Sequence, residues 1–171
     1  MSATKDVFKK YVKNIFIETG SYRGDGVGNA LAVGFKRAYS IELSPELWAY
    51  CVNLYEHNPN AVFLRGYSPD YLKVLMGNIH EPVTIWLDAH YSGGDTAKGV
   101  ETSPVMKELE VIRSHPVKTH TIMIDDIGDW EKYGYGITVE SAKEFIRTIN
   151  KDYRFILEEG VVSNDILVAV I

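Results

Sequence analysis

The sequence predicts an α/β fold in which a mostly parallel sheet carries helices on both faces. Short apolar segments alternate with helix-like segments along the chain, as they do in repeated βαβ units. The last two strand-like segments differ, because only the five residues "GVVSN" separate them. A parallel crossover needs roughly a dozen residues, so these two strands form an antiparallel hairpin.

Each element has its own signal in the sequence. The segment "PVTIWLD" at 82–88 is apolar enough for a central strand that is covered on both faces. The segment 138–150 has helical spacing, because Ala142, Ile146 and Ile149 fall on one face. In chain order, the predicted strands are 14–18, 38–43, 61–65, 82–88, 120–125, 153–159 and 165–171. The predicted helices are 28–37, 45–57, 69–78, 104–115 and 138–150, and residues 1–13 form a short helix or an extension.

Three predicted helices begin with a serine–proline dipeptide, at 44–45, 68–69 and 103–104. A serine side chain accepts hydrogen bonds from the free N–H groups of a helix start, and proline suits the first helical position. We therefore expect a serine cap at each of these three helix starts.

Composition narrows the class of protein. The 171 residues suit a single domain, residues 1–171. The formal net charge is −5 and there is no basic stripe, so we expect no nucleic-acid partner. The lone cysteine, Cys51, has no partner for an intrachain disulfide. No apolar run reaches the roughly 18 residues that span a bilayer, and the N-terminus lacks the apolar segment of a signal peptide. We expect a cytoplasmic protein with no membrane partner.

A glycine-rich turn, "IETGSYRGDG", follows the first predicted strand. No lysine stands where a phosphate-binding P-loop requires one. Gly24, Gly26 and Gly28 have the spacing G-x-G-x-G rather than the G-x-G-x-x-G of a dinucleotide site, and we interpret them as close packing at the start of the first helix. What remains is Glu18 at the strand end and a turn at Gly20, which suit the cationic, amino-acid-like S-adenosylmethionine.

A second acid, Glu42, ends the second predicted strand, 22 residues after Gly20. A carboxylate accepts hydrogen bonds from two donors at once, so Glu42 can bind both hydroxyls of a ribose. The alternative is an ordinary acid at the surface. The position of Glu42 after an apolar strand and before a helix start favours the ribose interpretation.

These segments also carry a resemblance. In this order, "FIETGSYRGDGV", "SIELSPELW", "WLDAHYSGG" and "IMIDDI" resemble the class I S-adenosylmethionine-dependent methyltransferases. The chain is similar to small bacterial and viral proteins of that fold and, more distantly, to metal-dependent sugar and macrolide O-methyltransferases of the macrocin type. The resemblance covers residues 14–171 and implies a Rossmann-like seven-stranded sheet with the order 3-2-1-4-5-7-6. Two positions depart from the family: Tyr22 replaces a usual glycine, and Tyr67 with Ser68 replaces an adenine-binding acid.

The resemblance implies a cofactor site beyond the ends of the first four predicted strands. Tyr67 would stack on the adenine in place of the missing acid. The candidate cofactor-binding residues are Glu18, Thr19, Gly20, Ser21, Tyr22, Glu42, Leu43, Tyr67, Ser68 and Asp88.

A second group of acids follows the fourth and fifth predicted strands, with Asp88 after one and Asp125 and Asp126 after the other. Adjacent parallel strands lie about 5 Å apart, and ligands bind beyond their carboxyl ends, so these carboxylates converge. Converging carboxylates repel one another unless a cation neutralises them. Oxygen ligands favour magnesium, with calcium or manganese as alternatives. By the resemblance to the macrocin-type enzymes, all three aspartates are metal ligands. The alternative is that one or two of them cap loops or bind the methionine part of the cofactor.

His90 follows Asp88 by two residues, where the related enzymes place a base. The ordinary pKa of histidine lies near neutral pH, which suits proton transfer. The resemblance implies that the metal binds and acidifies a substrate hydroxyl and that His90 takes its proton. Asp88 and His90 are therefore the candidate catalytic residues, and an ordinary loop histidine is the alternative.

Two loops face the predicted site. Residues 90–103 form a long glycine-containing loop of the kind that closes over substrates. Residues 126–136 offer aromatic rings that either stack on a sugar or planar substrate or pack internally. The residues expected near the substrate are Tyr91, Asp95 and Lys98 in the first loop, and Trp130, Tyr133 and Tyr135 in the second.

The predicted activity is methyl transfer from S-adenosylmethionine to a hydroxyl of a sugar or other small molecule, with a divalent metal. Two alternatives stay open: a nicotinamide-dependent oxidoreductase, against which the terminal hairpin argues, and a catalytically inactive S-adenosylmethionine-binding module. The chain is short, so the active site is either open or completed by a second copy in a homodimer or by a further domain.

Overall fold

A computed structural model of the protein describes residues 5–91, 99, 101–160 and 162–171. In these residues, seven strands form one sheet in the order β3-β2-β1-β4-β5-β7-β6. The five neighbouring strands β3, β2, β1, β4 and β5 run parallel to one another, and β7 lies antiparallel to both β5 and β6. The predicted fold class, strand order and terminal hairpin are confirmed. The strands are β1 (Ile15–Thr19), β2 (Arg37–Glu42), β3 (Ala61–Arg65), β4 (Thr84–Leu87), β5 (Thr121–Ile124), β6 (Arg154–Glu158) and β7 (Ile166–Val170).

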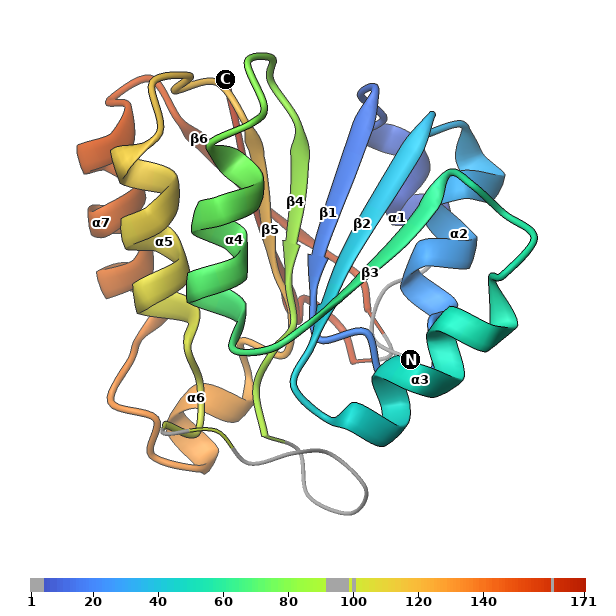
Figure 1. Ribbon diagram of the computed structural model, residues 1–171. Helices are drawn as coiled ribbons and strands as arrows, with labels where there is room; N and C mark the ends of the chain where they lie inside the picture. The colour runs from blue at the N-terminus through green and yellow to red at the C-terminus, as the bar shows by residue number, and fades with distance from the viewer. Residues whose placement is uncertain (1–4, 92–98, 100, 161) are drawn as a thin grey trace.

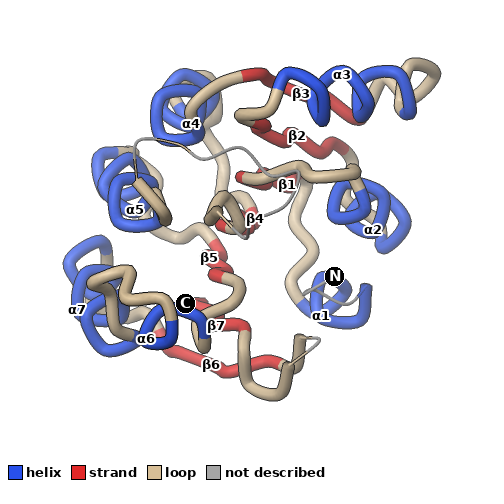
Figure 2. The backbone as a smooth tube through the Cα atoms, turned by 90° about the horizontal axis from the view of Figure 1, so that it is seen from below, coloured by secondary structure: helices blue, strands red, loops and turns tan. Residues whose placement is uncertain are grey.

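Helices cover both faces of the sheet. α4, α5 and α7 lie on one face, and α1, α2 and α3 lie on the other (Figure 1). The same two layers are seen from the carboxyl ends of the parallel strands in Figure 2. The helices are α1 (Lys5–Lys10), α2 (Asp25–Val33), α3 (Pro45–Leu54), α4 (Ser68–Met76), α5 (Val105–Ser114), α6 (Asp129–Lys132) and α7 (Val139–Ile149). None of these helices combines the length and apolar character needed to cross a bilayer.

The central strands β4 and β5 anchor the core, because all their residues are buried. Ile85 and Ile122 pack into the cluster under α4, α5 and α7, whereas Trp86 and Met123 pack into the cluster on the opposite face. Phe8 of α1 meets the Trp86 ring edge-on at 5.3 Å between centroids. Burying each such side chain stabilises the fold by roughly 1.5–3 kcal/mol, so the ends of β4 and β5 are held rigidly.

The first predicted helix was misplaced. It was expected over 28–37, but α2 begins at Asp25 and ends at Val33. Gly34 ends it in the left-handed conformation, with a φ of 116°, and the chain then enters β2 at Arg37. α2 therefore starts directly after the glycine turn, and its first residues lie beside Glu18.

Only one of the three predicted serine caps is present. Ser44 accepts a hydrogen bond from the Leu47 amide at the start of α3. Ser68 lies inside the first turn of α4, where its hydroxyl donates to the buried carboxyl of Glu108. Pro104, rather than Ser103, precedes the first residue of α5, and no side chain caps that helix. The dipeptide marked each helix start correctly, but the serine hydroxyls have different partners.

Candidate active site

The candidate site lies at the carboxyl ends of the parallel strands, the lower edge of the sheet in Figure 1. Two hollows open there on either side of Asp88, which lines both. The β1 hollow, of about 450 Å³, is lined by Phe8, Glu18, Gly20, Ser21, Tyr22, Arg23, Asp25, Gly26, Asn29, Trp86 and Asp88. The β4–α5 hollow, of about 220 Å³, is lined by Leu87, Asp88, Ala89, His90, Ser103, Pro104, Val105, Glu108, Ile124, Asp125 and Trp130.

The turn between β1 and α2 requires unusual backbone geometry at two positions. Gly20 has a φ of 84°, and a side chain there would collide with the backbone carbonyl of Asp88. Tyr22 has a φ of 45°, in the left-handed region that glycine adopts most easily. The related family usually has glycine at this position, and the structure shows that the backbone here keeps the conformation that favours glycine.

Glu18 is the centre of a buried polar chain. It is 3% exposed, and its Oε2 accepts a hydrogen bond of 2.6 Å from Ser40 Oγ. Ser40 Oγ in turn lies 2.6 Å from the hydroxyl of Ser21. A side chain at Gly26 would collide with the Glu18 carboxyl, which explains the glycine. Burial raises the pKa of Glu18 well above its usual range, although the Ser40 hydrogen bond opposes that shift.

Glu42 joins two turns. Its oxygens accept hydrogen bonds from the Tyr22 amide at 2.9 Å and from the Ser44 amide at 2.8 Å. Burial raises the pKa of this carboxyl, and the backbone hydrogen bonds oppose the rise. The amides of Leu43 and Ser21 also face this carboxyl, so the backbone supplies most of the donors that an ionised carboxylate accepts.

Half of the ten predicted cofactor-binding residues line the β1 hollow, and the other half lie outside its lining. Glu18, Gly20, Ser21, Tyr22 and Asp88 line the β1 hollow together, whereas Thr19, Glu42, Leu43, Tyr67 and Ser68 lie outside its lining. The hydroxyl of Tyr67 donates to Glu101, which also pairs with Lys107 at 3.1 Å. The Ser68 hydroxyl is engaged by Glu108, so it points into the protein rather than toward a ligand.

His90 lies between two carboxylates. Its Nδ1 is 3.4 Å from Asp88 Oδ1, and its Nε2 is 3.1 Å from Asp126 Oδ2. The second distance suits a hydrogen bond, but the ring N–H is poorly aligned with that oxygen, so the contact is an ion pair rather than a hydrogen bond. Burial opposes the imidazolium, but the carboxylates of Asp126 and Asp88 outweigh burial and raise the pKa of His90 to about 10.

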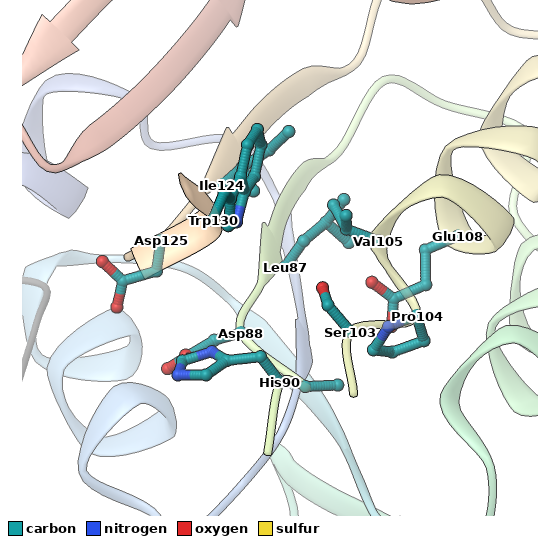
Figure 3. Close-up of a pocket in the computed structure, with 11 residues that line it drawn as sticks. Leu87, Asp88, His90, Ser103, Pro104, Val105, Glu108, Ile124, Asp125 and Trp130 are labelled. Atoms are coloured by element: carbon teal, nitrogen blue, oxygen red, sulfur yellow. The ribbon is translucent and has the colours of Figure 1, made fainter. Parts of the chain in front are cut away.

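The structure brings together a ligand set that differs from the predicted one. One donor atom each from Asp88, His90 and Asp126 lie within 4.8 Å of one another, so these three residues could hold a metal ion. Asp125, a predicted ligand, is not in this group. Its carboxyl lies at the end of β5, and the side chains of Asp88 and His90 lie beyond β4 (Figure 3). Asp126, the next residue, has a φ of 51°, in the left-handed region.

Asp125 is the least satisfied group of the site. It is 2% exposed, and among the described residues neither carboxylate oxygen has a hydrogen-bond partner of good geometry. Burial, and then the charges of Asp88 and Asp126, raise the pKa of Asp125 to about 9. A buried polar group without a partner costs roughly 1–3 kcal/mol, and such groups occur where a ligand, ion or water is expected.

Two buried acids at the site were missed by the sequence reasoning. Glu108 is 1% exposed, accepts hydrogen bonds from Ser68 and Thr19, and has its pKa raised by burial to about 7. A signal for Glu108 existed, because it stands on the apolar face of α5 between Val105 and Leu109. Asp165, at the end of the loop before β7, had no such signal, since only the folded hairpin brings it to the site.

The two predicted substrate loops are partly described. Trp130 is 3% exposed, packs in the core and also lines the β4–α5 hollow. Tyr133 is 56% exposed and stacks with Tyr135 at 6.1 Å between ring centroids. The Tyr135 ring lies 6.5 Å from the His90 ring, and its hydroxyl donates to the Tyr91 carbonyl at 3.4 Å. Asp95 and Lys98 lie outside the described residues.

Solved structures resemble the whole chain. No family profile and no curated protein matches the sequence. An O-methyltransferase from Bacillus cereus in complex with SAH has a TM-score of 0.61 and 15% identity over 98% of this chain and 78% of that one. A candidate rRNA methylase from Clostridium thermocellum has a TM-score of 0.66 and 15% identity, covering 97% and 93%. A precorrin-6y C5,15-methyltransferase from Geobacter metallireducens has a TM-score of 0.60 and 10% identity, covering 98% and 88%.

At these identities the similarity establishes the fold. The three proteins are described as acting on different kinds of acceptor, so the likeness itself selects none of them. The narrower resemblance to macrocin-type enzymes stays a prediction. The chain has the seven-stranded sheet of the S-adenosylmethionine-dependent methyltransferases.

Proposed function

We propose that the protein is an S-adenosylmethionine-dependent O-methyltransferase that acts on a hydroxyl of a sugar or other small molecule and uses a divalent metal. One observation carries the proposal. On a methyltransferase sheet, the histidine between Asp88 and Asp126 and the unpartnered carboxyl of Asp125 meet at the strand ends. The glycine turn and the β1 hollow lie directly beside these residues. Asp88 lines both the β1 hollow and the β4–α5 hollow.

The β1 hollow has the chemistry of a site for a cationic ligand. Glu18, Asp25 and Asp88 all line it, and Trp86 and Phe8 supply apolar surface. When bound, S-adenosylmethionine supplies an electrophilic methyl group on a positively charged sulfur. The turn at Gly20 lets the backbone approach Asp88 closely, so a ligand in this hollow meets carboxylates on more than one side.

A divalent cation fits the residues beyond β4 and β5. Asp88 and Asp126 offer carboxylate oxygens and His90 offers an imidazole nitrogen within a small space. The Asp126 amide and the charge of His90 only partly offset the burial of the Asp125 carboxyl, and a cation at this edge would offset it further. A bound divalent cation would supply the charge that acidifies a substrate hydroxyl.

The geometry refines the role predicted for His90. With a pKa raised to about 10, the ring carries a proton at neutral pH while both carboxylates face it. An imidazolium is not a base, so His90 takes a hydroxyl proton only after losing its own. That loss becomes easier when another positive charge shares Asp88 and Asp126. His90 therefore acts as a base only when another positive charge neutralises the carboxylates of Asp88 and Asp126.

The surroundings favour a small acceptor with hydroxyl groups. Tyr135 lies near His90, and the exposed Tyr133 ring continues that surface, so aromatic faces border the site. Rings of this kind stack on sugars and planar compounds. The net charge of −5 disfavours a nucleic-acid acceptor.

The test has two stages. Calorimetry with S-adenosylhomocysteine and, separately, with NAD distinguishes a methyltransferase from a nicotinamide-dependent enzyme, and we expect binding of the first only. Transfer of labelled methyl from S-adenosylmethionine is then measured with sugars and catechols as acceptors. We expect transfer that EDTA abolishes and magnesium restores. Activity that persists after exhaustive EDTA treatment removes the metal from the proposal, and binding without transfer to any acceptor favours an inactive module.

A further inference from the structure

The C-terminal hairpin places one further acid against the site. Asp165 stands immediately before β7, is 6% exposed, and was part of no predicted site. Its Oδ1 accepts a hydrogen bond of 2.7 Å from the Gly128 amide, and its backbone carbonyl accepts one of 3.1 Å from the Ile127 amide. Its carboxyl also lies against the carboxyl of Asp126. One residue therefore contacts three consecutive positions of the turn after β5.

The turn after β5 has unfavourable backbone geometry at Asp126. Asp126 has a φ of 51°, a left-handed conformation that is unfavourable for an L-residue. The Asp126 carboxylate meets His90, with Oδ2 at 3.1 Å from Nε2. Gly128 leaves room for the Asp165 carboxyl, because a Cβ there would lie 2.9 Å from Asp165 Oδ1. Asp165 therefore binds the two residues that follow Asp126.

We propose that Asp165 is a positioning residue that holds the turn 126–128 and orients the Asp126 carboxylate toward His90. This inference rests on the proposed function, in which Asp126 and His90 act together. The terminal hairpin would then contribute to the site, because it carries Asp165, which fixes the geometry of the turn after β5.

Two substitutions separate the roles of shape and charge. Asp165→Asn keeps a side-chain oxygen that accepts a hydrogen bond from the Gly128 amide, so it preserves the contact with the turn. Asp165→Ala removes that contact. Glu158→Ala is the matched control, since Glu158 is a buried acid of the same hairpin that binds Lys10 and Tyr11 at 2.6 Å, on the side of α1.

The first measurement is hydrogen exchange at the Gly128 amide, which needs no activity. We expect exchange at least about tenfold faster in Asp165→Ala than in the wild type, and unchanged exchange in Asp165→Asn and Glu158→Ala. Protection that survives Asp165→Ala overturns the proposal. Circular dichroism and S-adenosylhomocysteine affinity report whether each variant is folded.

The second measurement is turnover. We expect kcat to fall about tenfold or more in Asp165→Ala with cofactor affinity unchanged, and to stay within about threefold of wild type in Asp165→Asn. Equal losses in both variants would contradict a positioning role. Wild-type protein that neither binds S-adenosylhomocysteine nor transfers methyl refutes the proposed function instead, and the exchange pattern at Gly128 still decides whether Asp165 holds the turn.

Discussion

Two acidic groups lie side by side at the same edge of the sheet, yet they are built in opposite ways. Glu18 and Glu42, near the ends of β1 and β2, accept hydrogen bonds from Ser40 and from backbone amides, so the chain itself satisfies them. Asp125, after β5, accepts none, and Asp88 and Asp126 share a single histidine. A carboxylate whose hydrogen bonds are all made within the chain stabilises local structure. A buried carboxylate without such bonds is a site where a ligand, ion or water is expected to bind.

We interpret the ends of β1 and β2 as a preformed binding surface and the ends of β4 and β5 as the reactive part of the site. The β1–β2 side is already organised, so a ligand there meets a shape that does not have to rearrange. The β4–β5 side holds excess negative charge at a cost in stability, and it becomes stable only when a cation or donor arrives. The four predictions below test this contrast, from the largest expected effect to the smallest.

Removing the histidine should have the largest effect. His90→Ala leaves Asp88 and Asp126 facing each other without a base or a cation. We expect kcat to fall by about 10²–10⁴-fold while the affinity for S-adenosylhomocysteine is unchanged. His57→Ala is the control, because the His57 side chain is 93% exposed and remote from the described site. A turnover equal to that of the wild type would show that the β4–β5 side is structural too.

A methyl group added on the satisfied side should destabilise the fold. Gly26→Ala places a Cβ against the Glu18 carboxyl, which Ser40 holds in position. We expect the free energy of unfolding in urea to fall by about 2–3 kcal/mol. Gly77→Ala serves as the control, because its Cβ would lie 3.5 Å from the nearest atoms and its backbone is right-handed. A neutral Gly26→Ala would mean that Glu18 moves freely.

Neutralising the unsatisfied side should stabilise the fold instead. Asp125→Asn removes an acid whose pKa is raised to about 9 by burial and by its neighbours. The raised pKa means that Asp125 destabilises the native state increasingly as pH rises above its unfolded value. We expect the metal-free protein to gain about 1–2 kcal/mol at neutral pH and to lose methyl transfer. Glu158→Gln, treated in the same way, should give no gain in stability, because burial, which raises the pKa of Glu158, is outweighed by Lys10 and Tyr11, which hold that pKa below its usual value.

The opposite edge of the sheet offers a smaller contrast between histidines. His120 is fully buried, hydrogen-bonded to His115 and to the Val83 amide, and burial lowers its pKa from 6.5 to about 4. Its contribution to stability is complete above pH 6.5 and is lost as pH falls from 6.5 through about 4, because the unfolded state binds the proton more tightly. We expect a loss of about 1 kcal/mol at a pH of about 5.5, and a shallower slope in His120→Asn, both measured by urea unfolding.

Several features could be predicted because they depend on local pattern. The five-residue link "GVVSN" required a hairpin, and the apolar runs located β4 and β5. The position of Asp88 at one strand end and Asp126 at the next followed from parallel topology. The serine at 68 was misassigned because its partner, Glu108, is 40 residues away. Local reasoning offered the helix N-terminus as its partner, and tertiary packing supplied a better acceptor.

The sequence by itself determined the fold class, the terminal hairpin and which strand ends carry acids, because periodicity, turn residues and link lengths act between neighbours along the chain. The strand order was implied by the resemblance to the methyltransferases, and the structure confirms it. Only the tertiary structure decided which acids are paired. Glu42 is satisfied by the amide of Tyr22, His90 rather than Asp125 joins Asp88 and Asp126, and Asp165 reaches the site through the hairpin. Hydrogen bonding and charge act over a few ångströms in space, so they depend on contacts that spacing along the chain does not encode.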